Sequence, residues 1–271
     1  MPLDASVVVP TFCRPPILAE CLGWLSRQTF PRDRFEVLVV DDSGPENYAP
    51  NRELCEPSRW GFALRYFTTG LPVDVYGVTV ARNIGMREAA SPLVLYTDDD
   101  CYPHPAWVAE HVRLHGEVDR LALTGYRADD PAVLESPLPI RMTRQKCIEE
   151  WERSQRGEMG AGDFKTGNAS VKKAHLLEVG GFNESMAKAG EYGYTDRELG
   201  MRLLANRMTF RFHPDAAVYV VPPDEATSRA RKEGGSQERA RQRFRQIERE
   251  FRRKRIFARV LEFFGWKGGK A

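Results

Sequence analysis

Short apolar runs alternate with amphipathic stretches through the first hundred residues of the chain. Four runs predict buried strands, since each is rich in apolar residues and is bounded by turn-forming or polar residues; they span 6–10, 35–44, 62–69 and 92–100. Residues 16–28 carry apolar positions at helical spacing behind two prolines, and residues 77–91 predict a loop that enters a helix. This alternation of strand and helix predicts a parallel α/β sheet.

The pattern loosens in the second half. Residues 127–165 contain prolines, charges and a glycine-rich stretch, which predict long loops over a site and a short helix near 144–153. Further along, the pattern predicts a strand, a short helix and a Gly-Gly stop at 168–182, a helix at 195–207, two short strands at 208–214 and 216–223, and a long helix at 236–264. Thr195 and Glu198 have the spacing of a capping box for the helix at 195–207.

Polar residues gather directly after three of the predicted strands. Thr11 to Arg14 follow the first strand, Asp41 and Asp42 end the second, and Asp98 to Asp100 end the fourth. The carboxyl ends of parallel strands meet at one edge of the sheet, where ligands bind in open α/β folds. We therefore expect a functional site at this edge.

Three consecutive carboxylates at the end of a buried strand need compensation. Two unit charges about 4 Å apart repel by roughly 4 kcal/mol at an effective dielectric near 20. A divalent cation such as Mg²⁺ or Mn²⁺, which prefers oxygen ligands, would remove that repulsion, and strand periodicity places Asp98 and Asp100 on a similar side. The alternative is an exposed acidic turn before a helix at Pro105, whose N-terminal dipole favours carboxylates. The triplet alone leaves both interpretations open.

Composition favours a reduced compartment. The 271 residues include five scattered cysteines with no CxxC spacing, which predict free thiols rather than a zinc site or a disulfide framework. The first ten residues lack the basic and apolar regions of a signal peptide, and no apolar run approaches the length of a membrane span. We expect a cytoplasmic protein, either free or peripheral on the inner face of the membrane.

Charge divides the chain into a body and a tail. Residues 229–271 hold 15 Lys/Arg and 5 Asp/Glu, a net of +10, so the remainder carries 25 − 33 = −8. We expect a catalytic domain at 1–225 and a basic amphipathic helical tail at 226–271. The tail has three candidate roles: binding an anionic membrane surface through 236–264, packing on the domain or on a second copy in a homodimer, and binding nucleic acid. Nucleic acid is least favoured, since no recognised nucleic-acid motif accompanies the arginines.

Six segments in order give the chain a family resemblance. They are "VVVPTFCR", "FEVLVVDDSG", "ARNIG", "LVLYTDDD", "TGNASVKKAHLLEVGGFNES" and "YTDREL". Over roughly residues 5–220 the chain resembles a family 2 glycosyltransferase of the GT-A fold, a Rossmann-like, mainly parallel sheet flanked by helices. The resemblance implies transfer of a sugar from a nucleotide-diphosphate sugar to an acceptor hydroxyl, with Mn²⁺ or Mg²⁺. The acceptor, whether glycan, lipid-linked or small molecule, is left open.

The resemblance also implies roles for individual residues. The donor side would be formed by Pro10, Thr11 and Arg14 in the nucleotide pocket, Asp41 at the base, Asp98 near the ribose or sugar with Asp99 beside it, and Arg82 near the phosphates. Asp100, the last of the triplet, would bind the metal that bridges the diphosphate.

Asp196 is the candidate general base. Its place in the first turn of a predicted helix favours a carboxylate, and a base must be ionised to accept the acceptor's proton. One such displacement would invert the anomeric centre. The family usually has Glu-Asp where this chain has Thr195 and Asp196, so Glu191 is kept as a second candidate base. His213 is a weaker candidate, for a metal ligand.

Two other classes of protein remain as alternatives. One is a catalytically weak nucleotide- or sugar-binding adaptor of the same fold, which the altered pair at 195–196 would favour. The other is a nucleotidyltransferase, although such an enzyme would typically have a glycine-rich basic loop after the first strand, where this chain has "TFCRPP". A receiver-type domain would leave the triplet and the second half of the chain unexplained.

Overall fold

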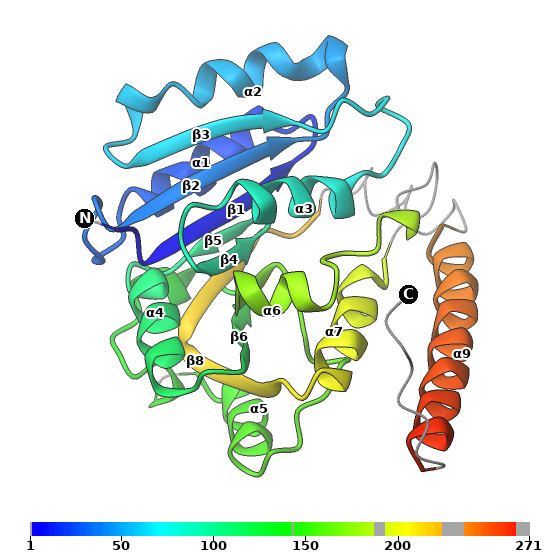
Figure 1. Ribbon diagram of the computed structural model, residues 1–271. Coiled ribbons are helices and arrows are strands. Elements are labelled where there is room, and N and C mark those ends of the chain that lie inside the picture. Colours follow the sequence, from blue (N-terminus) through cyan, green and yellow to red (C-terminus); the bar gives the residue numbers. More distant parts are fainter. Residues whose placement is uncertain (1, 143, 187–192, 224–235, 264–271) are drawn as a thin grey trace.

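One mixed sheet forms the centre of the molecule. The computed structural model describes residues 2–142, 144–186, 193–223 and 236–263, and within them eight strands lie in the order β3-β2-β1-β4-β7-β6-β8-β5 (Figure 1). The strands are β1 (Ala5–Thr11), β2 (Phe35–Asp41), β3 (Ala63–Thr68), β4 (Leu93–Thr97), β5 (Cys101–Pro103), β6 (Leu121–Ala128), β7 (Asn168–Lys172) and β8 (Thr209–Val220).

The first four strands in the sheet order are parallel, as the alternating pattern predicted. Every residue of β1 and β2 is buried, and Thr11 pairs with Asp41, which in turn pairs with Thr68. The polar residues that follow β1, β2 and β4 therefore meet at one edge. Beyond β4 the sheet becomes mixed, because β7 runs antiparallel to both β4 and β6. The predicted GT-A fold, Rossmann-like with a mainly parallel sheet, is confirmed.

Helices cover both faces of the sheet. They are α1 (Pro15–Leu25), α2 (Tyr48–Leu54), α3 (Val78–Glu88), α4 (Trp107–Glu117), α5 (Lys146–Gln155), α6 (Lys173–Glu178), α7 (Thr195–Ala205) and α9 (Ser236–Phe263). On one face α1 and α4 bury Leu22 and Trp107 against β1 and β2. On the other face, Leu176 of α6 and Leu203 of α7 pack with α3. Each such buried side chain contributes roughly 1.5–3 kcal/mol, so both layers hold the edge in place.

Two local predictions are wrong. The two short strands expected at 208–214 and 216–223 form one twelve-residue strand, β8, which pairs with β6 through a register shift between Gly125 and Arg127. Pro214 misled the sequence interpretation, since proline lacks a ladder donor and is tolerated at such irregularities. The capping box is also absent: Tyr194 is the N-cap of α7 with no side-chain bond, and Glu198 pairs with Arg202 at 2.6 Å.

The basic helix predicted at 236–264 is present as α9, which runs alongside α7 (Figure 1). Phe244, on its apolar stripe, is buried and stacks on Tyr194 with ring centroids 5.3 Å apart. Arg243 donates to the Ser185 carbonyl at 3.1 Å. This part of the stripe thus packs on the rest of the chain. No helix in the described ranges combines the length and the apolarity that crossing a membrane requires.

Candidate active site

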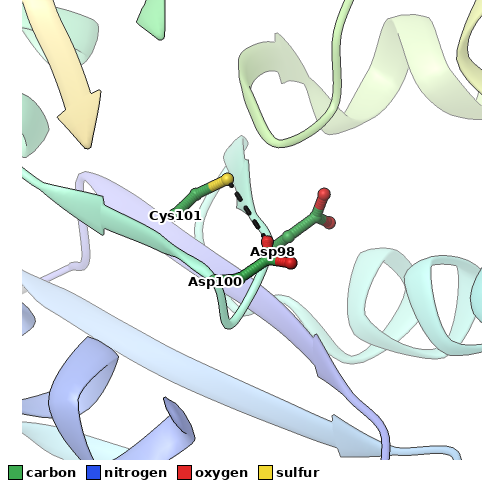
Figure 2. A group of neighbouring side chains, drawn as sticks. All are labelled: Asp98, Asp100 and Cys101. Atoms are coloured by element: carbon green, nitrogen blue, oxygen red, sulfur yellow. Dashed lines mark hydrogen bonds between the residues drawn. The ribbon is translucent and has the colours of Figure 1, made fainter. Parts of the chain in front are cut away.

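The side chains of the three aspartates after β4 point in two directions. The Asp99 side chain is buried and accepts a hydrogen bond from Thr11 Oγ1 at 2.8 Å. Asp98 and Asp100 instead lie in the turn between β4 and β5 with their carboxylates near each other (Figure 2). Strand periodicity correctly predicted which two would share a side.

Arginines compensate the charge of the triplet in this structure. Arg14 pairs with Asp99 and, at 3.0 Å, with Asp100 Oδ2, while Arg82 pairs with Asp98 at 2.7 Å. Burial raises the pKa of Asp99 to about 7, with Arg14 acting against the rise. Burial would also raise the pKa of Asp98, but Arg82 and Arg127 outweigh it and hold that pKa below its usual value. The triplet is therefore no exposed acidic turn: its repulsion is offset by guanidinium groups from three other elements.

Arg82 joins the triplet to the candidate base. This α3 arginine is buried, and its second guanidinium nitrogen lies 3.2 Å from Asp196 Oδ1. Asp196 sits in the first turn of α7 and also accepts from the Thr166 hydroxyl at 2.5 Å and the Thr166 backbone N–H at 3.1 Å. One guanidinium thus lies between the donor-side carboxylate and the candidate base. Glu191, the second candidate, falls outside the described residues.

The remaining predicted donor residues lie at the same edge, but Asp41 is fully engaged within the protein. Pro10 and Thr11 end β1 in buried positions. Asp41 accepts from Ser43, from Asn51 Nδ2 at 2.9 Å and from the Tyr66 hydroxyl at 2.7 Å. These contacts hold the turn after β2 in shape.

Asp42, which the sequence placed at the end of the second strand without a role of its own, is the other carboxylate of that turn. It accepts from the Gly77 N–H and the Thr69 hydroxyl, each at 2.7 Å, and burial raises its pKa to about 6. It thereby ties the turn to the start of α3. Its place beside Asp41 was visible in the sequence, but its contacts depend on residues about 30 positions away.

The sequence analysis did not predict a role at this edge for Cys101, Arg127 or Gly167. The sulfur of Cys101 lies within 4.8 Å of carboxylate oxygens of Asp98 and Asp100, and we call these three residues the turn cluster (Figure 2). Arg127, near the end of β6, is exposed at the edge, and its Nη2 lies 3.9 Å from the Cys101 sulfur. A Cβ on Gly167 would lie 2.9 Å from Asp98 Oδ2 and 3.1 Å from the Arg127 guanidinium carbon, so a glycine keeps this space open.

His213 lies in a different group. Its Nε2 is 3.0 Å from Glu110 Oε2 and 4.0 Å from Asp215 Oδ2. We call Glu110, His213 and Asp215 the α4–β8 cluster; their potential ligand atoms also lie within 4.8 Å of one another. Arg113 Nη2 donates to Glu110 at 2.8 Å and lies 3.1 Å from His213 Nε2, so a guanidinium already lies beside this group.

The mixed sheet with acidic residues at its carboxyl edge has the architecture of the GT-A fold, and comparison with known proteins supports this. The model of the Glycosyl transferase family 2 matches residues 6–176. The chain belongs to glycosyltransferase family 2, which confirms the resemblance found in the sequence.

Characterised relatives are larger than this chain. A validoxylamine A glucosyltransferase of Streptomyces hygroscopicus subsp. jinggangensis is 30% identical over 225 residues, covering 74% of this chain and 51% of the relative. A chondroitin synthase of Escherichia coli is 26% identical over 247 residues, covering 80% of this chain and 34% of the synthase. The chain thus spans about half or less of the length of these relatives.

Solved structures share the fold. The mannosyltransferase PcManGT from Pyrobaculum calidifontis, in complex with GDP-Man and Mn²⁺, has a TM-score of 0.64 at 20% identity and covers 86% of this chain and 63% of its own. TarS from S. aureus in complex with UDP-GlcNAc has a TM-score of 0.61 at 19% identity, with coverages of 81% and 59%.

Proposed function

We propose that this chain transfers a sugar from a nucleotide-diphosphate sugar to an acceptor hydroxyl, with a divalent metal, and inverts the anomeric centre. The observation that carries the proposal is the bridge from Asp98 through Arg82 to Asp196, which sets a donor-side carboxylate and a candidate base on opposite sides of one guanidinium. Family membership and two fold neighbours with bound nucleotide sugars support the donor class.

The ligand atoms of the turn cluster suit a divalent metal ion. Asp98 and Asp100 carry oxygen ligands of the kind that Mn²⁺ and Mg²⁺ prefer, within reach of one another. Bound there, the ion would neutralise charge that develops on the diphosphate leaving group. The proposal assigns metal binding to Asp100, as the resemblance implied, with Asp98 beside it.

The protein's own residues would bind and orient the donor. Arg14 and Arg82 supply guanidinium donors next to the cluster, as suits recognition of a diphosphate. Pro10, Thr11 and Asp99 form the buried floor behind them, and we assign the nucleotide to this side, with Asp41 shaping the base-side turn.

Asp196 would act as the general base. Arg82 and Thr166 orient its carboxylate, and the first turn of a helix suits a negative charge. The carboxylate takes the proton of the acceptor hydroxyl while the hydroxyl oxygen forms a bond to the anomeric carbon. The bond from that carbon to the diphosphate oxygen breaks with its electron pair on the diphosphate, and attack opposite the leaving group gives inversion.

Acceptor and location are finer proposals. The relatives include a chondroitin synthase and a poly(ribitol-phosphate) beta-N-acetylglucosaminyltransferase, so we assign a glycan or polyol hydroxyl as acceptor. The cytoplasmic location remains a prediction from the cysteines and the first ten residues, whereas peripheral membrane binding and the homodimer remain predictions from the arginine-rich tail. Co-sedimentation of the full chain with phosphatidylserine vesicles, against phosphatidylcholine vesicles, tests the former; sedimentation velocity tests the latter.

Calorimetric titration with UDP, GDP, dTDP and CDP, with and without Mn²⁺, tests the donor site. We expect one nucleotide to bind in a metal-dependent way and Asp100→Asn to lose that dependence. Asp215→Asn in the α4–β8 cluster is the matched control, since it removes an equivalent carboxylate away from the triplet. A folded wild type that binds none of the four with Mn²⁺ present would refute the transferase proposal and favour the adaptor.

A further inference from the structure

The turn cluster combines two kinds of ligand atom. Asp98 and Asp100 offer carboxylate oxygens from the turn after β4, and Cys101, the first residue of β5, offers a sulfur (Figure 2). The Cys101 side chain is fully buried, and its sulfur lies 3.6 Å from Asp100 Oδ1 and 3.9 Å from Arg127 Nη2. Although Cys101 contributes to the core beneath the sheet, its sulfur faces the charged groups of the site.

A second buried thiol nearby shows that proximity alone does not make such a cluster. Cys21 of α1 is also fully buried, and its sulfur lies 3.9 Å from the Asp98 backbone carbonyl. Among the five cysteines, all of which lie in the described ranges, Cys101 is the one whose sulfur groups with two carboxylates. Cys21 therefore provides a matched control.

We propose that Cys101 is a ligand of the metal held by Asp98 and Asp100, so that this site selects thiophilic divalent ions such as Co²⁺, Zn²⁺ and Cd²⁺ over Mg²⁺. The inference rests on the proposed function, because it places that metal at the donor site. On binding, the thiol proton leaves to solvent and a sulfur electron pair forms the bond to the ion.

The selectivity follows from ligand chemistry. Mg²⁺ takes hard oxygen ligands and tends to keep its waters, whereas sulfur suits softer ions. Affinity for a mixed site also rises from Mn²⁺ towards Co²⁺ and Zn²⁺. Arg82 and Arg127 lie next to the cluster and offset the added charge of a thiolate. An oxygen-only site in this position would lack this preference.

Titration of the full chain with Co²⁺, without any donor, tests the proposal by spectroscopy. Wild type and Cys21→Ser are expected to develop a near-ultraviolet thiolate-to-cobalt charge-transfer band. Cys101→Ser is expected to bind Co²⁺ on the order of tenfold more weakly and to lack the band. In competition, Zn²⁺ should abolish the wild-type band while a large excess of Mg²⁺ leaves it.

A measurement on the wild type alone guards against a variant that does not fold. X-ray absorption of the zinc-loaded protein should show one sulfur at about 2.3 Å from the ion. Bound Co²⁺ without a charge-transfer band, a band that survives in Cys101→Ser, or zinc with oxygen and nitrogen neighbours only would each overturn the inference. So would a wild type that binds a nucleoside diphosphate with Mg²⁺ but takes up no Co²⁺. In these four cases the transferase proposal stands, because it fails only when no nucleotide binds.

Discussion

Two clusters in this molecule have the same ligand spacing but different surroundings. In the α4–β8 cluster the carboxylates have nearby partners: Glu110 accepts from Arg113 and lies 3.0 Å from His213 Nε2, and Asp215 accepts from the Ile140 N–H at 2.7 Å. In the turn cluster, Asp98 and Asp100 pair outward with Arg82 and Arg14, which come from other elements at the sheet edge. The spacing of potential ligand atoms therefore does not by itself identify a ligand site.

What separates the two clusters is the origin of the compensating charge. The arginine of the α4–β8 cluster lies on α4, one turn from Glu110, and is fixed by its own helix. Arg14 lies in the loop after β1 and reaches Asp100 from a distant part of the chain, so we expect an incoming ion or phosphate to exchange with it. We therefore expect substitutions in the turn cluster to affect activity and those in the α4–β8 cluster to affect stability.

The largest contrast is expected for turnover. Asp196→Asn removes the proposed base while keeping its shape, and should lower turnover by about 10²–10⁴-fold. Nucleotide binding should persist, with an affinity shifted through Arg82, which loses one of its two carboxylate partners. Glu110→Gln, in the other cluster, should keep turnover within about twofold. Initial rates of donor-dependent product formation measure both, and an Asp196→Asn enzyme with wild-type turnover would remove Asp196 from the mechanism.

Metal affinity should separate the clusters next. Asp100→Asn is expected to weaken Mn²⁺ binding by at least about tenfold, because it removes a negatively charged ligand. Asp215→Asn should leave Mn²⁺ affinity unchanged, since the α4–β8 cluster is already neutralised from within. Electron paramagnetic resonance of free Mn²⁺ measures the two constants. Equal losses in both variants would mean that the clusters are not distinguished in this way.

The clusters should also respond oppositely to pH. The pKa of Asp99, beside the turn cluster, is raised to about 7, so the folded protein holds this proton more tightly than the unfolded chain. That stabilisation is present at low pH and is lost as pH rises towards 7. Asp99→Asn should therefore be more stable than wild type by about 1–2 kcal/mol near pH 8, with no gain below about pH 4. Urea unfolding at both pH values measures this difference in the free energy of unfolding. An Asp99→Asn variant less stable than wild type near pH 8 would contradict the prediction.

The smallest effect is expected at Glu110. A hydrogen bond with His213 lowers the pKa of Glu110 to about 2. Burial acts to raise this pKa, and a second hydrogen bond, with Arg113, acts to lower it. The ionised form is thus stabilised on folding, and this stability is present above about pH 4 and lost as pH falls through about 2. Glu110→Gln should cost about 0.5–1 kcal/mol near pH 7 and less on acidification. The same unfolding experiment checks whether its sign is opposite to that of Asp99→Asn.

The parallel half of the fold was predictable because its signal is local. β1, β2 and β4 are continuous apolar runs, and the aspartates after them lie in contiguous sequence. The second half depends on long-range pairing. β6 carries no distinctive pattern. β8 forms one strand rather than two because it pairs with β6 on both sides of a register shift. For that reason Arg127, near the end of β6, could not be placed at the site.

Cys101 was missed for a different reason. Cysteines were judged by their spacing from other cysteines, whereas the partners of this thiol are the carboxylates next to it in sequence. The contact between Arg82 and Asp196 spans 114 positions and rests on the packing of α3 near α7. The sequence identified Arg82 and Asp196 as candidate residues, but only the fold shows that they are in contact.

The shared guanidinium of Arg82 has a consequence for how the two halves of the site communicate. Since one cation serves Asp98 and Asp196, the charge state of either carboxylate alters the field at the other. Such linkage is reciprocal in free energy. Whatever binds beside Asp98 therefore changes the strength of the contact between Arg82 and Asp196, and loss of that contact changes the affinity for the ligand by the same factor.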